Sequence, residues 1–188
     1  MDFLEKVATL DPVPAGGAAA AYTATLAMAL AYKVVLFESN RKEPAPVVQA
    51  TLPVIQKEIE RLYQDLRRLV EEDAECYADF SKETWSGDGK KNNQAFLNIM
   101  TCSGWVMEKA VAGLERIRQL SRISSSKLKP HLRVAVELLS ASIAGTMCVA
   151  RENISQIRSA EKRKSYQRQL EILYDQALEK RDEVLAGL

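Results

Sequence analysis

The stretch GAAAAYTATLAMALAYKVVLFE, residues 17–38, decides the fold class because it is rich in alanine and apolar on every face. Such a segment forms a helix that must be surrounded by other helices or lie in a subunit interface. Its residues 18–37 are also long enough to suggest a membrane span. They consist largely of Ala, Tyr and Thr and include Lys33, so we interpret the segment as a buried helix of a soluble protein.

The remaining sequence predicts helices on both sides of this segment, because apolar residues recur at three- and four-residue steps. Residues 11–17 form a turn, since their two prolines and two glycines do not continue a helix. Helices are expected over residues 2–9, 17–38, 46–82, 92–120, 130–156 and 158–186. No strand-like alternation of useful length occurs. The sequence therefore predicts an all-α fold, a bundle of about five to six long helices in a single domain spanning residues 1–188.

Charge and cysteine usage narrow the functional classes. The net charge of +1 gives no basic field for nucleic acid, and the first residues do not read as a signal peptide. We therefore expect neither nucleic-acid nor membrane partners. Cys76, Cys102 and Cys148 are odd in number and widely spaced, without metal-ligand spacing. They predict reduced core residues in a reducing compartment, which indicates a cytoplasmic protein.

Asp73 interrupts an otherwise regular apolar stripe on the helix expected over residues 46–82. The stripe consists of Ile55, Ile59, Leu62, Leu66, Leu69, Cys76 and Phe80. A carboxylate at a core position must be paired, protonated or facing a cavity, because burial of a lone charge is costly. Burial would raise its pKa toward the range of a general base. From spacing alone, a structural ion pair or a helix rotation that lets Asp73 reach water is the favoured explanation.

Three further features are candidates for binding. Pro14-Ala-Gly-Gly17 precedes the apolar helix, where free N–H groups gather and glycine lets a ligand approach, although such turns are common. Arg41 and Lys42 follow the end of that helix, where cations either complement the helix dipole or capture an anionic ligand. His131, the only histidine, follows Pro130 at a helix start, where a surface or capping role is usual.

Taken in order, these segments resemble the cyclodeaminase/cyclohydrolase family of folate one-carbon metabolism. Its members include the C-terminal domain of formiminotransferase-cyclodeaminase and bacterial methenyltetrahydrofolate cyclohydrolases. The family's opening Pro-x-Pro-Gly-Gly-Gly-Ser resembles Pro12-Val-Pro-Ala-Gly-Gly-Ala18, and its basic signature resembles Asn40-Arg-Lys42. The family's Asp-x-Asp-Ala-x-Ala-Phe resembles residues 71–77, in which the second acid is Asp73.

The later family motifs are similar to Ser124-Ser125, to Pro130-His131 and to residues 145–153, which end in Asn153. The chain departs from the family pattern at several polar positions. Ala15 and Ala18 stand for a Gly and a Ser, and Ser124-Ser125 stands where Gly-Asn is expected. His131 replaces an Asp, and Val149 replaces an Asn. These losses imply either a different substrate or a relative without catalysis.

The resemblance implies a homodimer that binds a reduced folate and needs no metal or other cofactor. The implied reaction is hydrolysis of 5,10-methenyltetrahydrofolate to 10-formyltetrahydrofolate, or the related deamination of formimino-tetrahydrofolate. Asp73 is the expected catalytic base. The expected substrate-binding residues are Pro14, Gly16, Gly17, Arg41, Lys42, Ser125, His131 and Asn153, with Arg41 and Lys42 meeting the glutamate carboxylates. The alternative is a catalytically degenerate folate-binding or assembly subunit.

Overall fold

The computed structural model describes residues 2–85, 92–157 and 159–188, with side chains except those of 80–85 and 92–96. The described residues form six helices and no strand. The helices are α1 (Phe3–Val7), α2 (Gly16–Ser39), α3 (Pro46–Trp85), α4 (Asn92–Ile123), α5 (Lys129–Ser155) and α6 (Ala160–Ala186). The predicted all-α bundle is confirmed, and the helices begin and end within a few residues of the expected positions.

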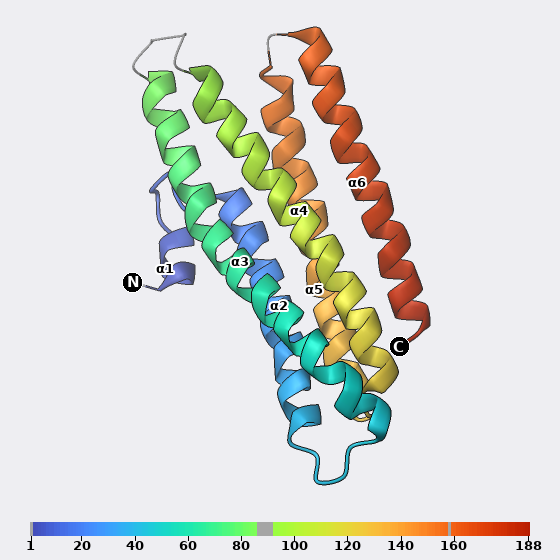
Figure 1. The fold of residues 1–188 in the computed structure, drawn as a ribbon. Coiled ribbons are helices and arrows are strands. Elements are labelled where there is room, and N and C mark those ends of the chain that lie inside the picture. The colour runs from blue at the N-terminus through green and yellow to red at the C-terminus, as the bar shows by residue number, and fades with distance from the viewer. Residues whose placement is uncertain (1, 86–91, 158) are drawn as a thin grey trace.

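The long helices run side by side along a common direction (Figure 1). α2 packs on α3 and α5, and α4 packs on the same two helices, so these four form a ring around one core. α6 covers α4 and α5 on the outside of this ring. The short α1 lies beside α2 and α3, near the start of α2 (Figure 1).

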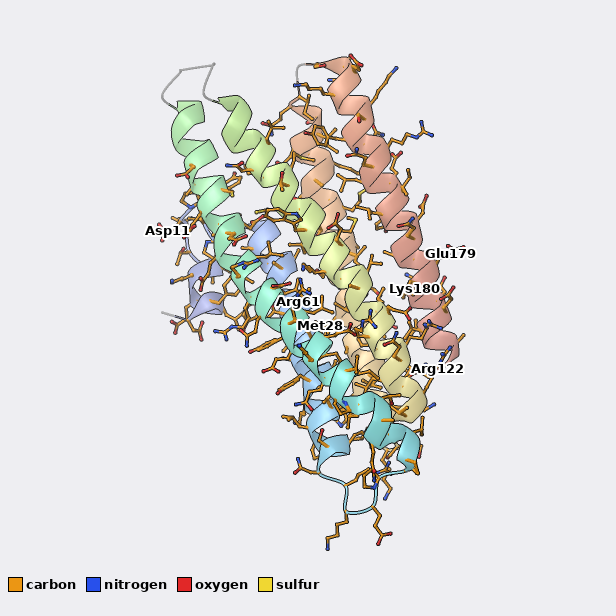
Figure 2. All side chains as sticks on the ribbon, in the orientation of Figure 1. Asp11, Met28, Arg61, Arg122, Glu179 and Lys180 are labelled. Atoms are coloured by element: carbon orange, nitrogen blue, oxygen red, sulfur yellow. The ribbon has the colours of Figure 1, made fainter. Side chains whose placement is uncertain are left out.

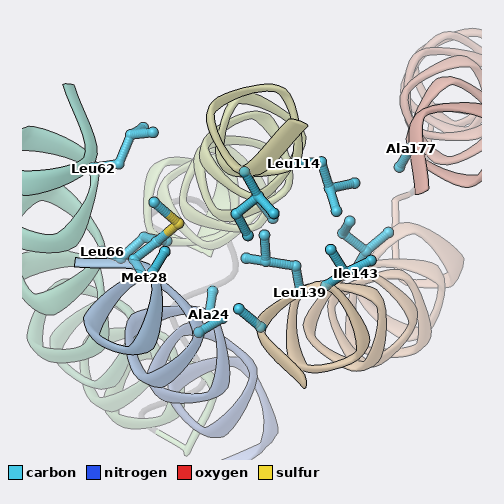
Figure 3. Packing of buried hydrophobic residues seen from close by; sticks show 14 of the residues in the cluster. Ala24, Met28, Leu62, Leu66, Leu114, Leu139, Ile143 and Ala177 are labelled. Atoms are coloured by element: carbon cyan, nitrogen blue, oxygen red, sulfur yellow. The ribbon is translucent and has the colours of Figure 1, made fainter. Parts of the chain in front are cut away.

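The core consists of the predicted helix stripes. Ile59, Leu66 and Leu69 of α3 are at most 2% exposed, and the expected apolar face of α5 is buried along its whole length. Met28, Leu66, Leu114, Leu139 and Ile143 meet near the centre of the bundle (Figure 3). α4 approaches α2 and α5 closely at Gly113, since a Cβ there would lie 2.8 Å from Met28 Sδ.

α2 is held in this core by small side chains. Ala21, Ala24, Ala27 and Ala31 are fully buried, which lets the neighbouring helices approach closely and gain dispersion contacts. α2 and α5 are each long and apolar enough to cross a membrane by composition, yet 50% and 44% of their most apolar windows are buried inside the bundle. A core helix gives the same signal as a membrane span.

The cysteine prediction is confirmed only in part. Cys102 is buried and Cys76 is half-buried, and their sulfur atoms lie 3.9 Å apart, although α3 and α4 place them far apart in sequence. Cys148 is exposed, so the prediction of a core position is wrong there. The physical reason is helix geometry: Met147 points into the core, and the next residue is turned about 100° away from it.

Ion pairs hold the outer faces of the bundle. Glu115 of α4 contacts Arg118 at 2.6 Å and Lys180 of α6 at 3.3 Å. These contacts, with the Arg118 hydrogen bond as the largest cause, lower the pKa of Glu115 to about 2. Lys180 lies on the α6 surface that faces α4 (Figure 2). The outer surface of α6 thus includes an ionic link to the neighbouring helix α4.

Candidate functional site

Asp73 of α3 is buried against the first turn of α2. It is 6% exposed, and its carboxylate accepts a hydrogen bond from the backbone N–H of Ala18. A Cβ built at Gly17 would lie 2.7 Å from Asp73 Cγ. No ion pair joins Asp73 to a cation among the described residues. The predicted burial is therefore confirmed. Neither an ion pair nor a helix rotation toward water accounts for Asp73, because its carboxylate contacts the N-terminus of α2.

This contact explains two sequence features together. The N-cap residue of α2 is Ala15, whose side chain makes no capping hydrogen bond, so the first N–H groups of the helix need another acceptor. Asp73 supplies that acceptor from a different helix, and its negative charge also complements the positive end of the α2 dipole. The carboxylate comes so close that only glycine fits at position 17 without a shift.

Burial changes the acidity of this carboxylate. Desolvation raises the pKa of Asp73 to about 6, and the Ala18 hydrogen bond offsets part of that rise. At neutral pH the group is therefore mostly ionised, yet it is a stronger base than an ordinary aspartate. A pKa near the working pH is what a general base requires.

α5 completes the surroundings of the α2 start. Val149 of α5 faces Gly16, since its Cγ2 lies 3.1 Å from a Cβ built there. Thr146 and Asn153 share this face of α5 because they lie three and four residues from Val149. Both are buried, and neither Thr146 Oγ1 nor Asn153 Nδ2 has a hydrogen-bond partner among the described residues. Buried polar groups of this kind normally bind water or a ligand.

The structure thus brings Gly17 against Asp73 at the start of α2, where Pro14 and Gly16 also lie, and places Asn153 one turn of α5 beyond Val149, which faces Gly16. The remaining predicted residues, Arg41, Lys42, Ser125 and His131, belong to the opposite end of the bundle. Twenty-one residues of helix separate Gly17 from Glu38, which corresponds to about 32 Å. Within one chain, the two groups therefore do not meet on one ligand of folate size.

Glu38, which sequence reasoning missed, organises that opposite end. It is 1% exposed, accepts a 2.7 Å hydrogen bond from the Ser125 N–H, and pairs with Arg41 at 3.0 Å. Lys42 and His131 are exposed. A signal was available, because Glu38 is the only acid in the apolar stretch of residues 17–38. Arg41 and Ser125 therefore have structural partners at this end.

A cavity of about 440 Å³ lies between α1, α2 and α3, and on α3 its lining reaches Glu71, two residues before Asp73. It is lined by Phe3, Lys6, Tyr22, Thr25, Leu26, Ala29, Tyr63, Arg67, Val70 and Glu71. Sequence analysis did not single out any of these residues. A concave site with aromatic walls and a few charged groups is typical of small-molecule binding. Among the described residues, no group of three or more His, Cys, Asp or Glu side chains is placed to hold a metal ion.

Comparison with known families now adds to this geometry. The sequence profile of the formiminotransferase-cyclodeaminase family matches residues 1–172. The chain belongs to this family. Membership places it in folate one-carbon metabolism, as the sequence motifs implied.

A similar solved structure carries the same fold. It is formiminotetrahydrofolate cyclodeaminase from Thermotoga maritima, with a TM-score of 0.90 and 22% sequence identity. The match covers 99% of this chain and 93% of that chain. A comparison with curated protein sequences gives no match.

The close approach of Asp73 to Gly17 is open to a direct stability test. We expect Gly17→Ala to lower the free energy of unfolding by about 1–3 kcal/mol, because the new methyl group displaces the carboxylate from the helix start. Gly104→Ala in the middle of α4 is the matched control, since a Cβ there meets nothing within 4 Å. The control should gain about 0.5–1 kcal/mol from helix propensity. Urea unfolding measures both, and equal stabilisation of the two variants would contradict the contact.

Proposed function

We propose that this protein hydrolyses 5,10-methenyltetrahydrofolate to 10-formyltetrahydrofolate, with Asp73 as the general base. The observation that carries the proposal is a buried carboxylate, its pKa raised to about 6, at the start of an apolar helix. Family membership supports the substrate class. No metal or other cofactor takes part, and a tetrahydrofolate derivative is the substrate.

The chemistry follows from the electrophilic carbon that bridges N5 and N10 of the substrate. Asp73 takes a proton from water while the water oxygen bonds to this carbon. The carbon–N5 bond then breaks, and Asp73 returns its proton to N5. The hydroxyl on the former bridge loses its proton to solvent as the formyl C=O forms on N10. Overall, one water molecule is consumed and one proton is released for each molecule of substrate.

The surrounding groups suit the binding of this substrate. Gly16 and Gly17 leave the backbone accessible to a flat ring, and Pro14 fixes the segment that leads into α2. Asn153 Nδ2 is a buried donor without a described partner, and we assign it to an oxygen of the ligand. Thr146 Oγ1 is available in the same way, one turn before Val149.

Two other functions rest on specific observations. The Thermotoga protein with the same fold is described as a formiminotetrahydrofolate cyclodeaminase, and release of ammonia from a formimino group would use the same base. A catalytically degenerate folate-binding or assembly subunit is favoured by Val149, because its methyl group contacts Gly16 where the family motif has an amide. Turnover measurements separate these functions from the cyclohydrolase.

Turnover is expected to depend on Asp73. The protein should accelerate the absorbance decay of methenyl-tetrahydrofolate above the spontaneous rate, and Asp73→Asn should reduce this by roughly 100- to 10,000-fold. The enzymatic rate should rise with pH through about 6, because the base must be ionised. Glu72→Gln, which removes a carboxylate paired with Arg68 on the same helix, is the matched control and should keep the rate.

Each other outcome assigns a different function. Ammonia release from formimino-tetrahydrofolate without methenyl hydrolysis would identify the cyclodeaminase. Binding of 5-formyl-tetrahydrofolate without either reaction would identify the degenerate subunit. A fully active Asp73→Asn variant would exclude Asp73 as the base.

We also propose that the protein is a cytoplasmic homodimer that buries the outer face of α2. Four large side chains of this helix are each 37–52% exposed, namely Tyr22, Leu26, Leu36 and Phe37. Before Glu38, the only charged residue of the helix is Lys33. Exposed apolar side chains along one helix suit a two-fold contact with a second copy. If the two α2 helices pack antiparallel, the Arg41 end of each lies beside the Gly16 end of the other. The free cysteines agree with a reducing compartment.

Light scattering tests the dimer. We expect a stable dimer at low micromolar concentration, converted to monomer by Leu36→Glu because a charge in the contact must be desolvated. Val54→Glu on α3 is the matched control, since Val54 is 61% exposed and lies away from α2's outer face. A monomeric unmodified protein would exclude the proposal, as would dissociation by Val54→Glu alone.

A further inference from the structure

The cavity between α1, α2 and α3 lies along the same two helices that meet at Asp73, although Asp73 is not itself among the lining residues. Its walls include Val70 and Glu71, within one helical turn of Asp73 on α3, and Tyr22, one turn beyond Ala18 on α2. Both helices therefore run from the buried carboxylate directly along the cavity. A ligand whose reactive carbon lies at Asp73 would extend into this space.

The walls are suited to a flat ring. Phe3 of α1 stacks on Tyr22 of α2, with ring centroids 4.3 Å apart and planes 10° from parallel. On the opposite side, the guanidinium of Arg67 lies over the Tyr63 ring, 5.8 Å from its centroid. Aromatic faces and a stacked guanidinium favour an aromatic ligand between them.

Two cations in the cavity remain available for an anion. Lys6 and Arg67 both line it, and neither makes an ion pair with another described residue. The neighbouring Arg68, in contrast, is engaged by Glu72 at 2.9 Å. The lining contains one acid, Glu71, so the cations exceed the acids by one. Asp2 and Glu5 form a capping box at the start of α1, which stabilises the helix that carries Lys6.

We propose that Lys6 and Arg67 bind the glutamate carboxylates of the folate, with the aminobenzoyl ring between Tyr22 and Tyr63. This assignment rests on the proposed function and names the part of the site that binds the substrate tail. Asp73 and Arg67 are six residues apart on α3, about 9 Å along its axis. That span is comparable to an aminobenzoyl group and its amide, which separate the reactive carbon of a folate from its glutamate.

The same assignment accounts for Arg41 and Lys42. Arg41 already pairs with the buried Glu38 at 3.0 Å, and the helix length places it about 32 Å from the Asp73 end of its own chain. Those two cations reach a folate only if a second copy delivers them. Lys6 and Arg67 belong to the same chain as Asp73 and need no such arrangement.

The test isolates the glutamate group. Titration calorimetry compares 5-formyl-tetrahydrofolate with 5-formyl-tetrahydropteroate, which lacks glutamate but keeps the reduced pterin and the aminobenzoyl ring. In the unmodified protein the glutamate form should bind roughly ten- to a hundredfold more tightly, as expected for charge-assisted contacts. Lys6→Ala/Arg67→Ala should remove this difference while the pteroate form binds as before, and Arg67→Lys should restore part of it.

Arg41→Ala/Lys42→Ala is the matched control and should keep the full difference between the two ligands. If that variant removes the difference and Lys6→Ala/Arg67→Ala does not, the inference is overturned in favour of cations from a second copy. If the two ligands bind equally to the unmodified protein and to all variants, no site binds the glutamate carboxylates. The inference then fails, while the proposed function stands. If neither ligand binds the unmodified protein, the proposed function fails as well.

Discussion

The rest of the structure depends on the contact between the Asp73 carboxylate and the first turn of α2. α2 begins without a side-chain cap, and its early N–H groups would be costly to leave buried without an acceptor. Asp73 satisfies one of them and adds a negative charge at the positive end of the helix. This contact stabilises the packing of α3 against α2. Desolvation of the carboxylate opposes that stabilisation and raises the pKa of Asp73 to about 6. The same balance of forces gives this capping carboxylate the raised pKa that the proposed base requires.

The carboxylates at the two ends of α2 differ in how their negative charge is compensated. Glu38 lies at the negative end of the helix, where a carboxylate is unfavourable unless it is compensated. The Ser125 N–H and the Arg41 guanidinium provide that compensation. Asp73 has the Ala18 N–H, and no cation among the described residues contacts it. Its charge is therefore weakly compensated against desolvation, which raises the pKa of Asp73.

The sequence predicts which side of each helix is buried, but it does not predict how far one helix is shifted along its neighbour. Steps of three and four residues within α3 correctly predicted that Asp73 is buried, because such spacing defines one side of a helix. This spacing does not predict which residues face Asp73, since these depend on the register of α2 along α3. The separation of Arg41 and Lys42 from Gly17, in contrast, follows from the length of the helix that the sequence predicts over residues 17–38. The sequence does not single out Lys6, because the stacking of Phe3 on Tyr22 that places α1 beside α2 is a contact without a periodic signature.

A carbon-13 NMR titration of the Asp73 side-chain carboxyl tests the central claim most directly. The resonance is assigned by its absence in Asp73→Asn. If the carboxylate is desolvated against the start of α2, its titration midpoint should lie near pH 6, well above the ordinary value of 3.8. A midpoint close to 3.8 would show a solvated carboxylate, and would contradict both the helix contact and the role of Asp73 as the base.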